Sequence, residues 1–358
     1  MDASTAMPSR RSPLPAALCW AGPPLAGLFI AGAALRRCAY ACGLKRARRA
    51  SVPVLSVGNL TAGGTGKTPA VACMVRGLKE RGRRPAVVLR GYGASMPGEL
   101  NDEGRELLRQ LPDVPVIANP DRLAGAAEAV RRGADVVVLD DGFQHWALAR
   151  DLDLVLIDAT DPWGGGHRLP WGYLREAPDA LSRAHAVLLT RVDRVEAGSL
   201  DALRRRVRQL APQVLLGTAR HRVSGLRALQ PGSSAPALDA MRGRRVFAVC
   251  GLARPEQFHL TLKESASEIA GTRSFADHHT YTADGLRSCF DEARTAQAEA
   301  VVITGKDASK WERLPMPEGN LPVWVLEIEF EITEGGEDLW RAVEERLSGK
   351  PAAQQSPS

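Results

Sequence analysis

The sequence predicts an α/β fold, an α/β/α sandwich joined to a second, smaller α/β domain and preceded by an N-terminal membrane-contacting helix. Three observations predict it. After residue 50, short β-branched runs alternate with helical patterns, as in parallel sheets covered by helices. A glycine-rich loop joins the first of these runs to the first helical pattern. An uncharged segment and a basic cluster precede both.

The composition excludes several classes of protein. With 358 residues, 44% hydrophobic and 25% charged, the chain matches a globular protein of two domains and not a disordered, fibrous or polytopic membrane protein. The net charge is +6, but residues 1–50 carry eight basic side chains and one acid, so the remainder is close to neutral and no nucleic-acid-binding stripe is predicted. The six cysteines form no CxxC pair, which favours reduced thiols in a cytosolic protein over disulfides or a zinc site.

The N-terminal segment, residues 1–50, has three possible interpretations. Residues 14–35 carry no charge and are long enough to span a membrane, which takes about 20 apolar residues. Pro15, Pro23 and Pro24 interrupt this stretch, however, and a secretory signal would export the phosphate-binding loop described below. We therefore favour an interfacial anchor, and a single membrane span and a secretory signal remain as alternatives. The basic residues of the anchor would bind anionic headgroups and keep the body of the protein cytoplasmic. These residues are Arg36, Arg37, Lys45, Arg46, Arg48 and Arg49.

Two series of predicted strands divide the body of the chain. The predicted strands are residues 52–57, 86–90, 114–117, 135–139, 152–157 and 186–190, then 245–250, 300–304 and 323–328. Residues 210–243 separate the series and show little periodicity, so we place a first domain at 51–220 and a second at 221–345. Residues 346–358 are rich in Pro, Ala, Gln and Ser and are expected to form a disordered tail.

The glycine-rich loop has the context of a P-loop, because it follows a predicted strand and opens a predicted helix. Its residues are Thr61, Ala62, Gly63, Gly64, Thr65, Gly66, Lys67 and Thr68. Backbone N–H groups of such a loop surround phosphate oxygens, Lys67 would reach the β- and γ-phosphates, and the Thr68 hydroxyl would bind Mg²⁺. Thr61 stands where the strict pattern has Gly. The sequence thus predicts an ATP site of the P-loop NTPase-like kind, with ATP and Mg²⁺ as cofactors.

Two acids and an arginine follow other predicted strands. Asp140 ends a buried-strand pattern, in the position of a Walker-B aspartate that holds the metal. Asp141 beside it is predicted to serve the phosphate acceptor, or else to be a turn residue. Arg90 follows another strand, where it would clamp a phosphate or merely occupy a Gly-rich turn.

These motifs together resemble those of the tetraacyldisaccharide 4′-kinase (lipid A 4′-kinase) family. The matching segments are Val57–Pro69, Arg90–Gly93, Asp140–His145, Arg168–Pro170, Leu174–Glu176, Cys250–Pro255, Asp277–His279 and Lys306–Asp307. The likeness runs in order from about residue 14 to 345 and includes the apolar-then-basic N-terminal segment. It implies an ATP-dependent lipid kinase of lipid A and lipopolysaccharide biosynthesis. The reaction would transfer the γ-phosphate to the 4′-hydroxyl of a tetraacyl glucosamine disaccharide 1-phosphate.

The resemblance also implies a location and catalytic residues. The lipid substrate lies in the inner membrane, so the protein would work on its cytoplasmic face, with no nucleic acid and no obligate protein partner. An aspartate of the family's Gly-Asp-Glu segment corresponds to Asp102, and its histidine partner to His278, with His279 as the alternative. Asp102 and His278 would align the sugar hydroxyl, assisted by Asp141.

The sequence departs from the family pattern at three positions. Asn101 replaces a Gly, Gly104 replaces a Pro, and Gly305 stands where the family commonly has Glu. The first two weaken the assignment of Asp102, and the third leaves position 305 without a role.

Two other functions fit the P-loop. A membrane-associated P-loop switch ATPase often carries a signature lysine, but the chain has Ala62 there. A GTPase-like metallochaperone would read guanine with a turn like Thr190-Arg191-Val192-Asp193, but Arg191 replaces its lysine and no Cys/His cluster is present to carry a metal.

Overall fold

The computed structural model describes residues 22–63, 66–91, 99–230, 237–265, 268–277, 279–317 and 321–348. Gly64 and Thr65 of the predicted phosphate loop and the predicted catalytic His278 therefore lie outside the described residues. Parts of the predicted N-terminal segment and of the predicted tail also lie outside them.

The described strands form one continuous sheet. Its order is β3-β2-β4-β1-β5-β6-β7-β11-β10-β8-β9. The strands are β1 (Val54–Asn59), β2 (Pro85–Leu89), β3 (Val116–Ala118), β4 (Val136–Asp140), β5 (Leu152–Asp158), β6 (Ala186–Thr190), β7 (Leu215–Ala228), β8 (Arg245–Gly251), β9 (Glu268–Phe275), β10 (Ala300–Thr304) and β11 (Val323–Glu334). Neighbours are parallel except for β7 and β11, which are antiparallel.

Helices cover both faces of this sheet. They are α1 (Gly22–Ala41), α2 (Lys67–Glu80), α3 (Asp102–Gln110), α4 (Arg122–Arg131), α5 (Ala197–Leu210), α6 (Pro255–Glu264), α7 (Ala283–Thr295), α8 (Gly305–Trp311) and α9 (Gly336–Ser348). Along β4, Val136 and Val138 pack in the core shared with α2, α3 and α9, whereas Val137 and Leu139 pack in the core shared with α4. Alternate residues of a strand point to opposite faces, so the predicted α/β/α fold class is confirmed.

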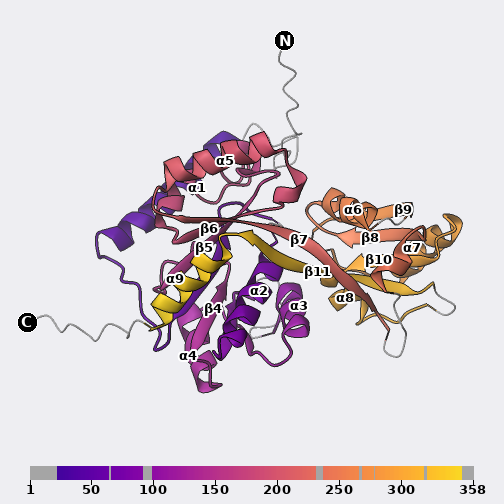
Figure 1. The fold of residues 1–358 in the computed structure, drawn as a ribbon, viewed down its shortest axis with the longest axis horizontal. Coiled ribbons are helices and arrows are strands. Elements are labelled where there is room, and N and C mark those ends of the chain that lie inside the picture. The colour runs from indigo at the N-terminus through magenta and orange to yellow at the C-terminus, as the bar shows by residue number, and fades with distance from the viewer. Residues whose placement is uncertain are drawn as a thin grey trace, which may run out of the picture.

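The molecule has two halves joined by a ribbon of two strands. We call β1–β6 with α2–α5 and α9 the first half, and β8–β10 with α6–α8 the second half. The ribbon is the antiparallel pair β7–β11, which runs between the halves (Figure 1). Residue 220, the predicted domain boundary, lies inside β7, and the chain returns to the first half at α9, where Leu339 and Val343 share a core with Leu55. The domain division at residues 220 and 345 remains a prediction. Because α9 packs in the core of the first half, a division by packing would assign α9 to the first domain.

The N-terminal helix α1 begins at Gly22. Pro23 and Pro24 lie in its first turn, where a residue without an N–H breaks no helical hydrogen bond. Pro23 and Pro24 thus break no hydrogen bond of the described helix. Residues 14–21 lie outside the described part of the chain, so the expectation that prolines interrupt the stretch 14–35 stays a prediction. Near the helix end, Tyr40 stacks on Trp146 of the first half. None of the described helices is both long enough and apolar enough to cross a membrane.

Candidate active site

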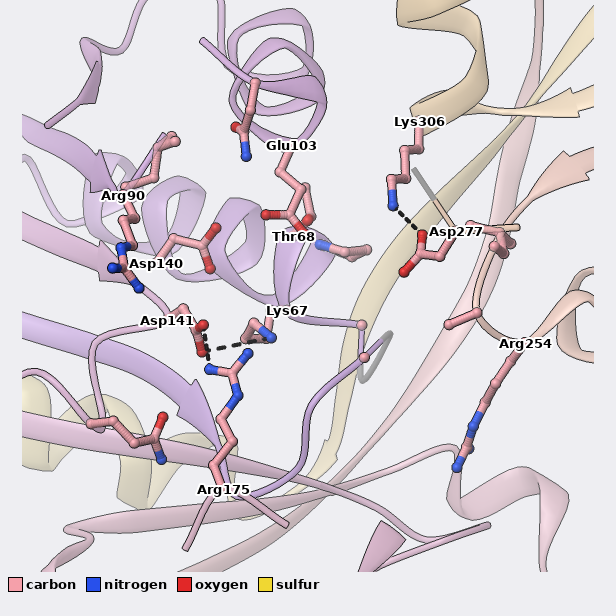
Figure 2. Close-up of a pocket in the computed structure, with 18 of the residues that line it drawn as sticks. Lys67, Thr68, Arg90, Glu103, Asp140, Asp141, Arg175, Arg254, Asp277 and Lys306 are labelled. Carbon is pink, nitrogen blue, oxygen red and sulfur yellow. Dashed lines mark hydrogen bonds and ion pairs between the residues drawn. The ribbon is translucent and has the colours of Figure 1, made fainter. Parts of the chain in front are cut away.

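A cavity of about 1220 Å³ lies between the two halves, above the carboxyl ends of β1, β2 and β4. Open α/β sheets bind ligands at this edge. Its walls come from the phosphate loop, from α3, from α1 through Phe29 and Arg36, and from the second half through Arg254 and Lys306. Figure 2 shows side chains of both halves pointing into it.

The phosphate loop forms because glycines allow its backbone conformation. Gly63 and Gly66 have φ angles of 92° and 78°, in the left-handed region that favours glycine, and Gly66 caps α2. The Asn59 side chain, at the end of β1, donates to the carbonyl of Thr61 at 2.6 Å and accepts from Lys67 Nζ at 3.4 Å. Lys67 and Thr68, the first residues of α2, both line the cavity, as the P-loop prediction requires.

Asp140 ends β4 and is almost completely buried. Its Oδ1 has no hydrogen-bond partner among the described residues. Burial and the negative charge of Glu103 raise the pKa of Asp140 to about 7, although Lys67 acts in the opposite direction. Thr68 lines the same cavity as Asp140, and a buried carboxylate with an unpartnered oxygen together with a hydroxyl group fits a divalent cation. The two groups supply hard oxygen ligands and leave the other positions to phosphates and water, as Mg²⁺ prefers.

Asp141 is held quite differently from Asp140. Its φ of 57° is uncommon for a residue other than glycine, and its carboxylate pairs with Arg175 at 2.5 Å and with Lys67 at 3.7 Å (Figure 2). Burial alone would raise the pKa of Asp141, but Lys67 and Arg175 outweigh it and lower that pKa. The lowered pKa favours the charged form of Asp141, and its carboxylate lies 3.7 Å from the ammonium of the phosphate-loop lysine.

Besides Arg175, two further arginines line the cavity with Asp140 and Asp141. Arg90 follows β2 and lines the cavity beside Asp140, where the sequence predicted it. Arg122 begins α4, and burial lowers its pKa to about 10 despite the nearby charges of Asp140 and Asp141. The sequence analysis assigned no role to Arg122 or Arg175, since neither lies in the phosphate loop or beside Asp140 in the sequence.

The predicted catalytic residues are only partly described. Asp102 is the first residue of α3. Its carboxylate forms an ion pair with Lys310 of α8, in the other half, at 3.0 Å, and a second one within α3 with Arg105 at 3.8 Å. The described lining of the cavity includes its neighbour Glu103 rather than Asp102 itself. Because His278 lies outside the described residues, the Asp102–His278 pair stays a prediction.

The segment that carries His278 borders the cavity. Asp277 lines it and pairs with Lys306 of α8 (Figure 2). His279, the alternative catalytic histidine, stacks on Phe275, with ring centroids 4.3 Å apart.

Buried arginines that line the cavity also connect the halves. Arg254 of the second half bonds Asp158 at 2.7 Å and Asp161 at 2.5 Å, both in the first half. Arg191 also pairs with Asp158, so its guanidinium is already occupied by a carboxylate. This pairing weighs against a base-reading role for the turn at Arg191, as a GTPase would need.

The ribbon touches the phosphate loop directly. A β-carbon at Gly66 would lie 2.2 Å from Nε2 of His221, which comes from β7. Burial and the charge of Arg191 lower the pKa of His221 to about 3, so the imidazole is neutral. The sequence analysis did not single out His221, because no local pattern links it to residue 66.

A glycine-rich loop that opens a helix, a buried aspartate at the end of the neighbouring parallel strand and a second half facing both define a P-loop protein of the phosphotransferase kind. The family model described as "Tetraacyldisaccharide-1-P 4'-kinase" matches residues 18–348, and the chain belongs to this family. The resemblance found in the sequence is thereby confirmed.

Individual relatives agree with the family match. The chain is 42% identical over 343 residues to a tetraacyldisaccharide 4'-kinase of Anaeromyxobacter sp. (strain Fw109-5), covering 90% of each chain. It is 39% identical over 293 residues to that of Geobacter metallireducens, covering 77% of this chain and 83% of the relative. The crystal structure of LpxK from Aquifex aeolicus in complex with ATP is similar at a TM-score of 0.70 and 26% identity, covering 90% of this chain and 98% of that one.

Proposed function

We propose that the chain transfers the γ-phosphate of ATP to the 4′-hydroxyl of tetraacyldisaccharide 1-phosphate, a lipid A precursor. The observation that carries this proposal is the convergence of Lys67, Thr68 and Asp140 on one cavity that both halves enclose. Membership of the kinase family supplies the reaction and the acceptor. The similar Aquifex structure is a complex with ATP, which supports ATP as the phosphate donor.

The phosphate loop and its acids would bind the nucleotide. Lys67 neutralises the β- and γ-phosphates, and the backbone of residues 61–68 surrounds them. Thr68 and Asp140 would hold Mg²⁺, which when bound offsets the charge that develops on the transferred phosphoryl group. Arg90 would add a further positive charge near the phosphates. Asp141 would hold the side chain of Lys67 in position through their ion pair.

The acceptor would enter from the side of α3 and α8. Asp102 directs the 4′-hydroxyl toward the γ-phosphorus and His278 orients Asp102, since phosphoryl transfer of this kind depends on alignment more than on base strength. The Asp102–Lys310 pair supports this assignment, because it places Asp102 where the two halves meet.

The N-terminal segment would bring the enzyme to the cytoplasmic face of the inner membrane. Helix α1 supplies part of the cavity wall, and Leu25, Leu35 and Leu44 in or just after it are exposed apolar side chains. A helix with exposed leucines next to Arg36 and Arg37 could lie on an anionic membrane surface without crossing it. The acyl chains could then stay near the membrane while the headgroup reaches the phosphate loop.

A transfer assay tests the function. Full-length protein in mild detergent would be given Mg²⁺, ATP labelled on the γ-phosphate and tetraacyldisaccharide 1-phosphate. Label in the lipid is the expected result. Hydrolysis of ATP with no labelled lipid would instead indicate the membrane-associated P-loop switch ATPase.

A further inference from the structure

Helices α3 and α8 meet across the two halves at two successive turns. At the first contact, Asp102 pairs with Lys310 at 3.0 Å. One turn further along α3, the carboxylate of Glu106 lies directly on Gly305, the first residue of α8. Because Asp102 and Glu106 are four residues apart on one helix, they share the face that packs on α8.

The second contact leaves no room for a side chain. A β-carbon at Gly305 would lie 2.4 Å from Oε1 and 2.7 Å from Oε2 of Glu106, distances that real β-carbons do not show. The backbone of Gly305 is the start of a helix and is not in the left-handed region, so glycine is not needed there for its conformation. The group that a β-carbon at 305 would meet is therefore the Glu106 carboxylate.

Glu106 is not free to move aside. Its Oε1 accepts from Arg109 Nη2 at 2.8 Å and from Gln110 Nε2 at 2.6 Å, and Arg109 in turn donates to Glu327 of β11 at 2.9 Å. Only 12% of the Glu106 side chain is exposed. The carboxylate is thus held on α3 through Oε1 and linked to the ribbon through Arg109, while Oε2 is buried with no hydrogen-bond partner among the described residues.

We propose that Glu106 and Gly305 form a spacer that sets the distance between α3 and α8 and so holds Asp102 and Lys310 in register for phosphoryl transfer. Both are positioning residues, which act through Asp102. This inference rests on the proposed role of Asp102 in the kinase reaction. It gives position 305, to which the sequence assigned no role, a function in the alignment of the two halves.

A double-mutant cycle tests the spacer. The variants are Gly305→Ala, Glu106→Ala and the double variant, assayed for label transfer as full-length proteins. Overpacking in the wild-type background should lower kcat by about tenfold. It should leave the KM for ATP within about twofold, because neither Glu106 nor Gly305 belongs to the phosphate loop, although both line the same cavity. In the Glu106→Ala background the added methyl group has space, so Gly305→Ala should then cost nothing further.

Gly198→Ala is the matched control, because Gly198 lies in the first turn of α5 and a β-carbon there would have no atom within 4 Å. Thermal unfolding accompanies each assay. If Gly305→Ala alone fails to fold while the double variant folds, the contact is supported. Equal losses of kcat in both backgrounds would overturn the spacer, as would a folded Gly305→Ala with normal kcat. If wild-type protein does not label the lipid, the proposed function fails instead.

Discussion

The ammonium of Lys67 lies 3.7 Å from the carboxylate of Asp141, which Arg175 holds from its other side. The phosphate-loop lysine is therefore oriented by the acid that follows Asp140, and Asn59 completes its surroundings. The two adjacent aspartates differ in their surroundings: Asp141 forms ion pairs with Lys67 and Arg175, which lower its pKa, whereas burial and the charge of Glu103 raise the pKa of Asp140.

Replacement of Lys67 by Ala should lower kcat by about a hundredfold or more, because a charge that stabilises the transferring phosphoryl group is lost. The change leaves the core of the first half intact, so the melting temperature should stay close to that of the wild type. Label transfer and thermal unfolding measure the two effects. Lys79→Ala, an exposed position on the same helix, is the control. A fully active Lys67→Ala protein would refute the P-loop assignment.

Asp102→Asn should reduce kcat by about a hundredfold or more, since the amide cannot align the hydroxyl as a carboxylate does. Lys310→Met removes the same ion pair but keeps the Asp102 carboxylate, so its loss should be much smaller. Steady-state transfer kinetics distinguish the two variants, with exposed Asp113→Asn as control. Equal losses in Asp102→Asn and Lys310→Met would show that Asp102 matters only through its ion pair.

The metal-free protein should respond to pH through Asp140. Its pKa is about 7 in the folded protein, whereas an aspartate in the unfolded chain has a pKa of about 4. The folded state thus favours the protonated acid, and the stability that this provides is lost as the pH rises through about 7. Asp140→Asn avoids that loss.

We therefore expect Asp140→Asn to raise the melting temperature in EDTA at about pH 8, with a gain that shrinks toward about pH 4. The variant should transfer no phosphate, and added Mg²⁺ with ATP should stabilise it less than wild type. Thermal unfolding at the two pH values measures the effect. A gain that is the same at both would mean that the Asp140 carboxyl is not the titrating group.

Serine in place of Leu35 or Leu44 should weaken binding to anionic vesicles by about tenfold each, because each exposed side chain would lose its burial in the lipid surface. Neither leucine is part of the described cavity lining, so transfer in detergent should be unchanged. Cosedimentation with vesicles is the measurement. Leu260→Ser on α6 removes an equally apolar exposed side chain from the second half and should have no effect. Undiminished vesicle binding by both N-terminal variants would exclude α1 and the turn after it as the membrane contact.

Much of the first half could be predicted from local pattern. The phosphate loop and each of the six strands consist of consecutive residues, so a local pattern can reveal them. Each of the six predicted strands begins within two residues of the first residue of the observed strand. Strand β7 was missed because its sequence resembles a linker. Its exposed Arg220 and Arg222 alternate with His221 and Val223, which are only half-buried, so no strongly apolar face marks the strand. It is stabilised by pairing with β11, a partner about a hundred residues away in the chain.

The site was predicted in part for the same reason. Thr68 lies in the phosphate-loop motif and Asp141 follows Asp140, and both line the cavity as their positions in the sequence suggested. Arg122, Arg175 and His221 also line it, but they come from other elements, and no role was assigned to them from the sequence. Their charges and contacts depend on three-dimensional neighbours: Asp140 and Asp141 for Arg122, and Gly66 for His221. No spacing rule in a single sequence encodes such pairs.

The β7–β11 ribbon restricts how the two halves can move. A flexible linker would allow the second half to swing about any axis. Paired antiparallel strands can twist and bend but hardly stretch, because their backbones are already nearly fully extended, and the hydrogen bonds between them resist sliding. His221 ties this torsional element to the phosphate loop at Gly66. The width of the cavity should therefore depend on the twist and bend of the ribbon, and a ligand that binds the phosphate loop would act on the same strand that leads to the acceptor side.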